Sequence, residues 1–428
     1  MKDSGSNRSE YPKGCRETAR KLSGSLPTSS CQFQYLLAPD ATSVYQTPMK
    51  SPGMSRVALV QAQSYDRSHL QEQISLALTH LGGLDQFVKP GMKVLLKPNL
   101  LSAKTPDRAI TTHPEFVAAV GRLAKQLGAK VLIGDSPAGA EKGIDRLWNN
   151  CGLSEVAVRD GFELVNFEMS GSSPVKVGEK TYFIAKPVLD ADLVISLPKL
   201  KTHVLTLMTG AIKNTFGCIP GFRKGLYHKE APNPRHFARV LVDIHTAVRP
   251  GLNIVDAITA MEGDGPASGT PRQLGLVLAS TDAVALDTVM ASIIGLPPQK
   301  LYTSRIAAER GLGVSDMSQI NVIGEAWESV ALKDFKLTSN LAMELLPKFV
   351  FDSVSRFIWQ LPRIEPDDCS LCGSCVAACP TEALTEALDG GVPVLHEEKC
   401  INCWCCHEIC PSKAISIEKS WLATKLIR

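Results

Sequence analysis

Two cysteine-rich segments near the C-terminus repeat each other, and they constrain the fold more than any other feature of the chain. The segment "PRIEPDDCSLCGSCVAACPTEAL" aligns without gaps with "PVLHEEKCINCWCCHEICPSKAI", at an offset of 31 residues. Each has the spacing C-x2-C-x2-C-x3-C-P, and together they hold nine of the thirteen cysteines. A duplicated unit of this kind builds two similar sites. Cysteines clustered in a chain without a recognisable export signal indicate metal ligands rather than disulfides.

This spacing is typical of bacterial two-cluster ferredoxins. Three thiolates on one tight loop can bind three irons of a cube, and the fourth, after the Cys-Pro turn, reaches the partner cluster. We therefore predict two [4Fe–4S] clusters in a small α+β ferredoxin domain over residues 362–418. The first would be ligated by Cys369, Cys372, Cys375 and Cys410, and the second by Cys400, Cys403, Cys406 and Cys379.

One cysteine is surplus to this scheme. Cys405 aligns with Ser374, a position that no ligand requires, so the sequence assigns it no role. The alternative for the whole segment is a zinc site with four cysteine ligands. Zinc ribbons use two separated C-x2-C pairs and not four cysteines in one run, which favours iron–sulfur.

The rest of the chain predicts an α/β domain over residues 54–330. Short apolar runs such as "RVALVQA", "KVLLKPN", "KVLIGDSP", "DLVISLP", "GLNIVDAI" and "QLGLVLAS" alternate with helical patterns. Strands that are apolar throughout are buried on both faces, so a mainly parallel or mixed sheet with helices on both faces is expected. The stretch "SPVKVGEKTYFIAKP" alternates like a hairpin and is the reason to allow a mixed sheet.

The remaining segments are predicted to be accessory. Residues 1–53 are rich in Ser, Thr, Pro and charge and are expected to be a disordered tail, with Met54 as an alternative start. Residues 331–361 read as a helical linker and 419–428 as a second tail. No apolar run is long enough to span a bilayer, and no secretory signal is evident, so we predict a cytoplasmic protein.

Composition and missing motifs leave several functions without positive support. A net charge of +3 is too small to indicate a nucleic-acid partner. No G-x-G-x-x-G follows a strand, and there is no phosphate-binding P-loop and no C-x3-C-x2-C. Nicotinamide binding, ATP hydrolysis and radical chemistry based on S-adenosylmethionine therefore lack support.

The segment from residue 193 to 229 contains no acidic residue. It begins at the end of a strand, where open α/β sheets bind their ligands, so its lysines can form a positive concavity for a carboxylate or phosphate. Its glycines allow close approach of the backbone, and "TGAIKN" can begin a helix. The alternative is a solvated basic loop. The candidate residues here are Lys199, Lys201, His203, Gly210, Lys213 and Asn214.

Other strand ends add opposite charges to the same edge of the sheet. Paired opposite charges shift each other's pKa and can act as acid–base pairs. We predict catalytic roles for Lys199, Lys201, His203, Lys213, Asp135, Asp256 and Glu262, and ligand binding by Lys97, Asn99, Gly210 and Asn214. For His203 a general acid, a metal ligand and a core histidine remain equally open.

These motifs together resemble a known family. The combination of "LLKPNLL", "GDSPAG", "LPKLKTHVLTLMTGAIKNTFG" and "VDAITAMEGDGPASGTP" with the cysteine repeat is similar to the iron–sulfur centre proteins called domain of unknown function 362. The resemblance covers about residues 56–415. It implies an α/β domain followed by a ferredoxin module and implies no settled activity.

Three functions remain open at this point. The first is a ferredoxin-coupled oxidoreductase, supplied with electrons by a redox partner protein and acting on an anionic small molecule or cofactor at the basic edge. The second is an electron-transfer or cluster-carrier protein whose α/β domain docks a partner. The third is a metal-handling or cofactor-maturation protein that uses His203, His228 and carboxylates.

Overall fold

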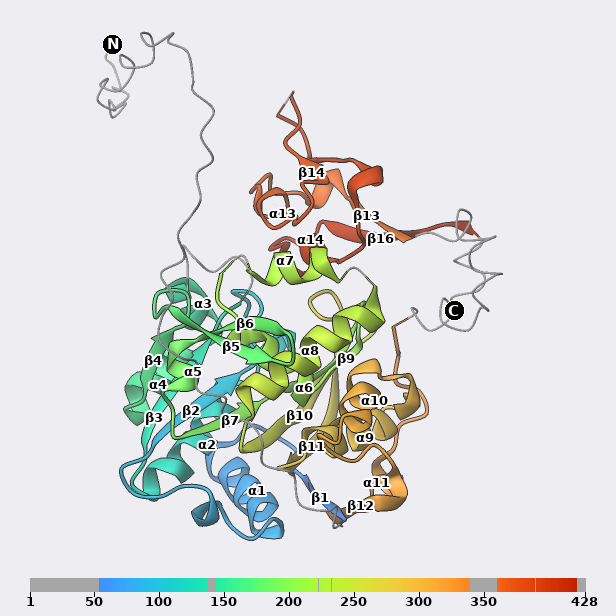
Figure 1. Ribbon diagram of the computed structural model, residues 1–428. Coiled ribbons are helices and arrows are strands. Elements are labelled where there is room, and N and C mark those ends of the chain that lie inside the picture. The colour runs from blue at the N-terminus through green and yellow to red at the C-terminus, as the bar shows by residue number, and fades with distance from the viewer. Residues whose placement is uncertain are drawn as a thin grey trace, which may run out of the picture. The chain divides into compact units, whose positions relative to one another are not determined.

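The computed structural model describes residues 54–137, 144–221, 223–231, 233–338, 360–388 and 390–421. The predicted N-terminal tail, most of the predicted helical linker and the last residues of the predicted C-terminal tail lie outside these ranges. Figure 1 shows the α/β domain with the cysteine-rich module at one end of it. Within the described ranges, no helix has both the length and the apolar character needed to cross a membrane.

A ten-stranded mixed sheet forms the α/β domain, as predicted. Its main path runs β12-β1-β11-β10-β7-β2-β3-β4. Pairs β10–β7, β7–β2, β2–β3, β3–β4 and β1–β12 are parallel, whereas β11 is antiparallel to both neighbours. The bounds are β1 Ser55–Gln61, β2 Lys93–Pro98, β3 Lys130–Asp135, β4 Glu163–Asn166, β7 Leu193–Leu197, β10 Leu252–Glu262, β11 Thr270–Ser280 and β12 Ile320–Gly324.

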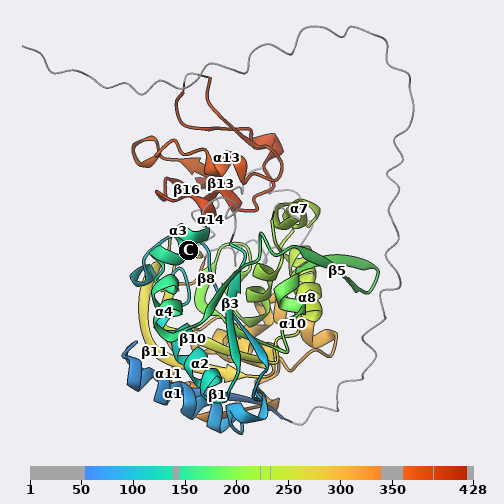
Figure 2. The same ribbon diagram turned by 90° about the vertical axis from the view of Figure 1, so that its left-hand side faces the viewer.

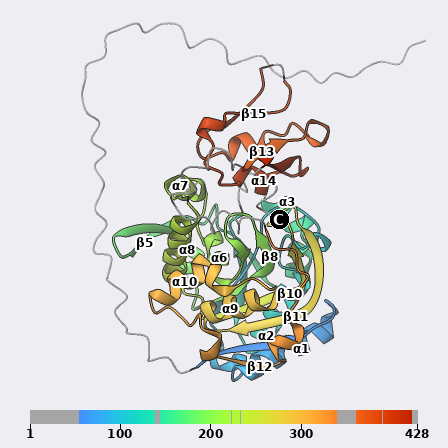
Figure 3. The ribbon, with the colours of Figure 1, turned by 90° about the vertical axis from the view of Figure 1, so that its right-hand side faces the viewer.

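Helices cover both faces of this sheet because successive strand residues point to opposite sides. In β1, Ala58 and Val60 join one apolar cluster while Val57 and Leu59 join another. The first cluster contains α1 Arg67–His80, α2 Pro114–Gln126, α3 Ile144–Asn150 and α4 Leu153–Asp160. The opposite face is covered by α6 Ala211–Asn214, α8 Pro234–Val248, α9 Ala283–Ile293 and α10 Tyr302–Glu309. Figures 2 and 3 show these helices on either side of the sheet.

Two features differ from the expected strands. The predicted hairpin exists as β5 Ser172–Val177 and β6 Lys180–Ala185, but it forms its own two-stranded sheet. The mixed character of the main sheet comes instead from β10 and β11, two 11-residue strands that pair antiparallel from Asn253 with Ser280 to Glu262 with Thr270. The acidic stretch after "GLNIVDAI" therefore continues a strand as far as Glu262 and is not wholly a loop.

The basic segment is not a solvated loop. Residues Lys199–His203 form strand β8, which is buried at every position, and this strand pairs with β9 Leu207–Thr209. Lys199 and Lys201 are each only 1% exposed. Short strand β9 leads directly into α6, which carries Lys213 and Asn214.

The cysteine-rich module repeats its structure as it repeats its sequence. The first half supplies β13 Gln360–Ile364, α13 Ser374–Ala377 and β14 Leu384–Thr385, and the second supplies β15 Val394–Leu395, α14 Cys405–Ile409 and β16 Ile415–Lys419. Strand β13 pairs with β16, and β14 pairs with β15, both antiparallel. The expected small α+β fold is therefore observed. In Figures 1 to 3, α14 lies on the side of the module that faces the α/β domain.

Candidate functional site

The eight repeat cysteines surround two small hollows, four to each. Cys369, Cys372, Cys375 and Cys410 line the first, and Cys379, Cys400, Cys403 and Cys406 line the second. These are the two sets of ligands that the sequence predicts, including the exchange of the fourth cysteine between repeats. We call the corresponding sites cluster one and cluster two.

Each hollow is lined by four cysteines, which is the number of thiolate ligands that one [4Fe–4S] cluster takes. When bound, the clusters supply one-electron chemistry.

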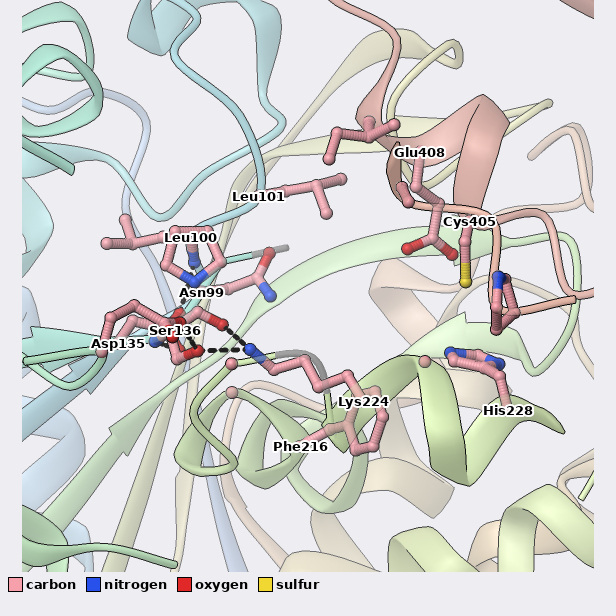
Figure 4. Close-up of a pocket in the computed structure, with 18 of the residues that line it drawn as sticks. Asn99, Leu100, Leu101, Asp135, Ser136, Phe216, Lys224, His228, Cys405 and Glu408 are labelled. Atoms are coloured by element: carbon pink, nitrogen blue, oxygen red, sulfur yellow. Dashed lines mark hydrogen bonds between the residues drawn. The ribbon is translucent and has the colours of Figure 1, made fainter. Parts of the chain in front are cut away.

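A cavity of about 500 Å³ lies where the module meets the α/β domain (Figure 4). Its floor comes from the ends of β2 and β3, from α6 and from α7 Arg223–Glu230. The cysteine-rich module closes it with residues of α13 and α14 and with Cys379, a cluster-two cysteine. Of the predicted site residues, the structure brings six to this cavity: Lys97, Asn99, Asp135, Lys213, Asn214 and Cys379.

A buried ion pair forms one wall of the cavity. Lys97 Nζ lies 3.0 Å from Asp135 Oδ1, and neither side chain is more than 2% exposed. Asp135 also accepts hydrogen bonds from the backbone N–H groups of Leu100 and Ser136, at 2.8 Å each. Asn214 accepts a hydrogen bond from Lys97 Nζ through Oδ1 and donates from Nδ2 to the Lys97 carbonyl. The pair is therefore fixed from several directions.

Two further lysines line the cavity. Within the described part of the chain, Lys213 has neither a hydrogen bond nor an ion pair from its ammonium group. Burial lowers the pKa of Lys213, and the carboxylate of Glu408 opposes that effect. Lys224 donates to the carbonyl and hydroxyl oxygens of Ser136, whose hydroxyl donates to Glu168. Burial lowers the pKa of Lys224 to about 8.

Glu408 lines the cavity and is absent from the predicted site residues, as are Glu168 and Lys224. Oε1 of Glu408 lies 3.0 Å from Nε2 of His203. His203 Nδ1 accepts from the backbone N–H of Leu205 at 3.1 Å, and burial lowers the pKa of His203 to about 4, so the ring is neutral. Burial alone would raise the pKa of Glu408, but His203 and Lys213 hold it well below its usual range.

A signal for Glu408 was present in the repeat. The residue of the first repeat that aligns with Glu408 is Ala377, so a carboxylate stands where the module's own fold needs none. Trp404 shows the same asymmetry, because it aligns with Gly373. Trp404 is 3% exposed and packs into an apolar cluster with Phe216 and Phe237 of the α/β domain. Glu408 and Trp404, two positions at which the second repeat differs from the first, are thus both associated with residues of the α/β domain.

Six of the site residues predicted in the α/β domain do not line the cavity. Lys199 forms a separate buried pair with Asp256, at 2.8 Å, and the hydroxyl of Tyr65 joins both. Lys201 donates to the Ile110 carbonyl, and Glu262 accepts from the backbone N–H of Lys336. A Cβ on Gly210 would lie 2.3 Å from Asp287 Oδ1, so that glycine makes room for a carboxylate that caps α6. His203 does not line the cavity itself, but it contacts Glu408, which does.

Several polar atoms of the cavity lining have no hydrogen-bond partner among the described residues. These buried atoms are Asn99 Oδ1, Thr209 Oγ1 and His228 Nδ1. His228 is 6% exposed and stacks on Phe237 with ring centroids 4.1 Å apart. Buried polar groups are nearly always hydrogen-bonded, so these atoms indicate a cavity that takes a polar ligand or ordered water.

Comparison with known proteins agrees with this organisation. Residues 94–292 match the family model described as a domain of unknown function (DUF362), and residues 361–411 match a 4Fe-4S dicluster domain. A thylakoid-associated protein of Synechocystis sp. is 41% identical over 261 residues, which are 60% of this chain and 80% of that protein.

One solved structure illustrates a more distant similarity. It is the lactate racemase apoprotein from Thermoanaerobacterium thermosaccharolyticum, at 12% identity and a TM-score of 0.37. The match covers 56% of this chain and 57% of that chain, so this protein spans little more than half of the racemase.

The matched segments coincide with the two structural parts described above. The first contains strands β2 to β11 and the cavity floor, and the second contains all eight cysteines of the two hollows. The chain therefore belongs to the domain of unknown function 362 family, and its C-terminal module is a 4Fe-4S dicluster domain that binds two [4Fe–4S] clusters.

Proposed function

We propose that the protein is an oxidoreductase in which cluster two exchanges electrons with an anionic organic molecule bound in the cavity. The observation that carries this proposal is that Cys379 and Lys213 line the same cavity. A site for electrons and a site for a negative charge therefore share one enclosed space. A carrier protein that only docks a partner would not require such a cavity.

The lining suggests how the molecule would be held. Lys213 offers an ammonium group that has no partner among the described residues, which suits a carboxylate or phosphate. Leu100, Leu101 and Phe216 supply apolar surface for an organic body. Pockets of this kind, largely apolar with a few polar groups, fix both the affinity and the orientation of a small ligand.

Proton supply is the second requirement, because an organic acceptor that gains electrons usually gains protons as well. Lys224, with a pKa of about 8, can release and recover a proton near neutral pH. Its hydrogen bonds to Ser136 link it to Glu168, which also lines the cavity. We propose Lys224 as the proton donor and Lys97 with Asp135 as the fixed pair that orients the site.

The exposure of the cysteines suggests where a redox partner protein binds. Cys372 of cluster one is exposed, and Leu371 beside it is 56% exposed. Cys403 and Cys406 of cluster two are buried, each 8% exposed. We propose that a partner protein delivers electrons at the Cys372 side and that cluster two passes them to the cavity.

The predicted cytoplasmic location is also a proposal. The Synechocystis relative is named as thylakoid-associated. We propose that a pool of this chain likewise associates with thylakoids while its cavity opens to the cytoplasm. Fractionation of membranes and soluble extract, followed by immunodetection, would show whether the protein is found in the soluble extract alone or also with the thylakoid membranes.

The test uses anaerobically purified protein with both clusters loaded. Benzoate, 2-naphthoate and phenyl phosphate serve as probes, and their effects on the melting temperature and on the reoxidation rate of reduced clusters are measured. Lys213→Met should abolish the stabilisation by a probe that raises the melting temperature of the parent. A ligand at one hundred times its Kd stabilises by about 2.7 kcal/mol, which is readily measured.

Lys199→Met is the matched control, because it removes a buried lysine that does not line the cavity. It should lower stability but leave the effect of the probe intact. The proposal fails if none of the three probes stabilises the parent or reoxidises its clusters. It also fails if Lys213→Met and Lys199→Met respond alike.

A further inference from the structure

The charged side chains that line the cavity balance one another. They are three lysines and three carboxylates: Lys97, Lys213, Lys224, Asp135, Glu168 and Glu408. Lys97 pairs with Asp135, and the hydroxyl of Ser136 joins Lys224 to Glu168. Lys213 and Glu408 remain, and within the described part of the chain they form no ion pair with each other. One positive group and one negative group are therefore left for a ligand.

These two groups reach the cavity from opposite sides. Lys213 lies on α6 in the floor of the cavity, and Glu408 lies on α14 of the cysteine-rich module that closes it. Figure 4 shows the Glu408 carboxylate pointing into the cavity. Oε1 of Glu408 contacts His203, whereas Oε2 has no hydrogen bond or ion pair with any described residue. A ligand between α6 and α14 would meet a cation on one side and an anion on the other.

A ligand that carried only a negative charge would leave Glu408 without a cation. Burial lowers the pKa of His203 to about 4, so its neutral ring adds no positive charge beside Glu408. A carboxylate removed from water without a cation or hydrogen-bond donors is strongly disfavoured. The lining also offers His228 Nδ1, a buried atom that has no hydrogen-bond partner among the described residues. The module side of the cavity therefore calls for a positively charged donor.

We propose that the ligand of the cavity is a zwitterion of the amino-acid class, whose carboxylate binds Lys213 and whose ammonium group binds Glu408. An ammonium group has three N–H donors, so it can bond Glu408 Oε2 and His228 Nδ1 together. The apolar lining from Leu100, Leu101 and Phe216 would surround the side chain of the ligand. This inference rests on the proposed function, because it names the class of molecule that binds at the same site.

The experiment is calorimetric titration of the full chain near neutral pH, with both clusters loaded under anaerobic conditions. Three probes share one phenylethyl skeleton. Phenylalanine carries both charges, 3-phenylpropionate carries only the carboxylate, and phenethylamine carries only the ammonium group. Phenylalanine should bind roughly ten- to hundredfold more tightly than either of the others, because each of them lacks one charge-assisted hydrogen bond.

Two variants assign the charges of the ligand to residues. Glu408→Gln should reduce the affinity for phenylalanine to that of 3-phenylpropionate, while 3-phenylpropionate itself binds no more weakly than before. Lys213→Met should reduce the affinity for phenylalanine to that of phenethylamine. Asp243→Asn is the matched control, since it changes a buried carboxylate that does not line the cavity and should keep the order of the three probes. Iron and acid-labile sulfide are measured on every variant, so that only cluster-loaded protein is compared.

The inference is overturned if 3-phenylpropionate binds the parent as tightly as phenylalanine, or if none of the three probes binds. It is also overturned if cluster-loaded Glu408→Gln keeps the preference for phenylalanine. If Glu408→Gln does not load its clusters, the order of the probes in the parent and in Lys213→Met decides. Equal binding of phenylalanine and 3-phenylpropionate would refute the zwitterion and leave anion binding intact. The proposed oxidoreductase is judged separately, by reoxidation of its reduced clusters and by the three anionic probes used above.

Discussion

Substituting Gly217 by alanine tests whether the buried Lys97–Asp135 pair is held as firmly as its contacts indicate. A Cβ on Gly217 would lie 1.9 Å from Asp135 Oδ1 and 2.6 Å from Lys97 Nζ. Both distances are far below van der Waals contact, so the pair must separate. Asp135 has little freedom to move, because the backbone N–H groups of Leu100 and Ser136 bind its two oxygens.

Two opposing contributions set the change that Gly217→Ala makes to the free energy of unfolding. Breaking a buried ion pair costs about 3–5 kcal/mol. Replacing glycine by alanine restricts the unfolded chain and returns about 0.4–1 kcal/mol. The expected loss is therefore about 2–4 kcal/mol, which corresponds to a melting temperature lowered by roughly 5–10 °C. Thermal unfolding of the cluster-loaded protein, followed by circular dichroism, measures this change.

Gly225→Ala is the matched control. A Cβ on Gly225, in helix α7, would meet only the Cβ of Pro380 at 3.5 Å, an ordinary contact. Alanine is also the better helix former, so this variant should be as stable as the parent or more stable. The reasoning is refuted if Gly217→Ala melts at the parent temperature. With Asp135→Ala already present, Gly217→Ala should cost less than it does in the parent, because the nearer of the two obstructing groups is gone.

Two further predictions concern the contact between the module and the α/β domain, and the buried lysines. Trp404→Ala removes a buried indole from the apolar cluster that also contains Phe216 and Phe237, so it should cost about 3–5 kcal/mol and expose the module to limited proteolysis. An unchanged melting temperature would contradict this role. Burial lowers the pKa of Lys201 from 10.5 to about 7, so the unfolded state binds more protons between those values and parent stability should rise with pH from 7 to 9. Urea unfolding should show a smaller slope in Lys201→Met than in the parent, because Lys224 and Lys213 also have lowered pKa values, and an equal slope in the variant would be the contrary result.

The fold could be predicted well because its signals are local. Each apolar strand alternates its contacts between two helical layers, and runs such as "KVLLKPN" can do so only in a sheet covered on both faces. The cysteine spacing likewise contains the whole arrangement of ligands, since the exchange of Cys379 and Cys410 follows from the Cys-Pro turn. Both depend on residues near each other in the sequence.

The candidate site was predicted only in part, because the direction in which each side chain points decides whether the residue lines the cavity. Lys199 and Lys213 are both basic residues of one segment, yet only Lys213 lines the cavity. Strand β8 directs Lys199 to Asp256, a pairing between residues 57 positions apart that composition does not reveal. Glu408 was not predicted for a different reason. It lies between the cluster cysteines Cys406 and Cys410, and the sequence does not reveal its contact with His203 of the α/β domain.

The exchange of the fourth cysteine has a consequence for assembly. Each cluster draws ligands from both repeats, so neither half can complete its site alone. Insertion of one cluster orders ligands of the other, and we expect loading to be cooperative, with few singly loaded molecules. Cys379 and Pro380 also form part of the cavity wall. A newly made chain would then complete this cavity wall only when its clusters are inserted.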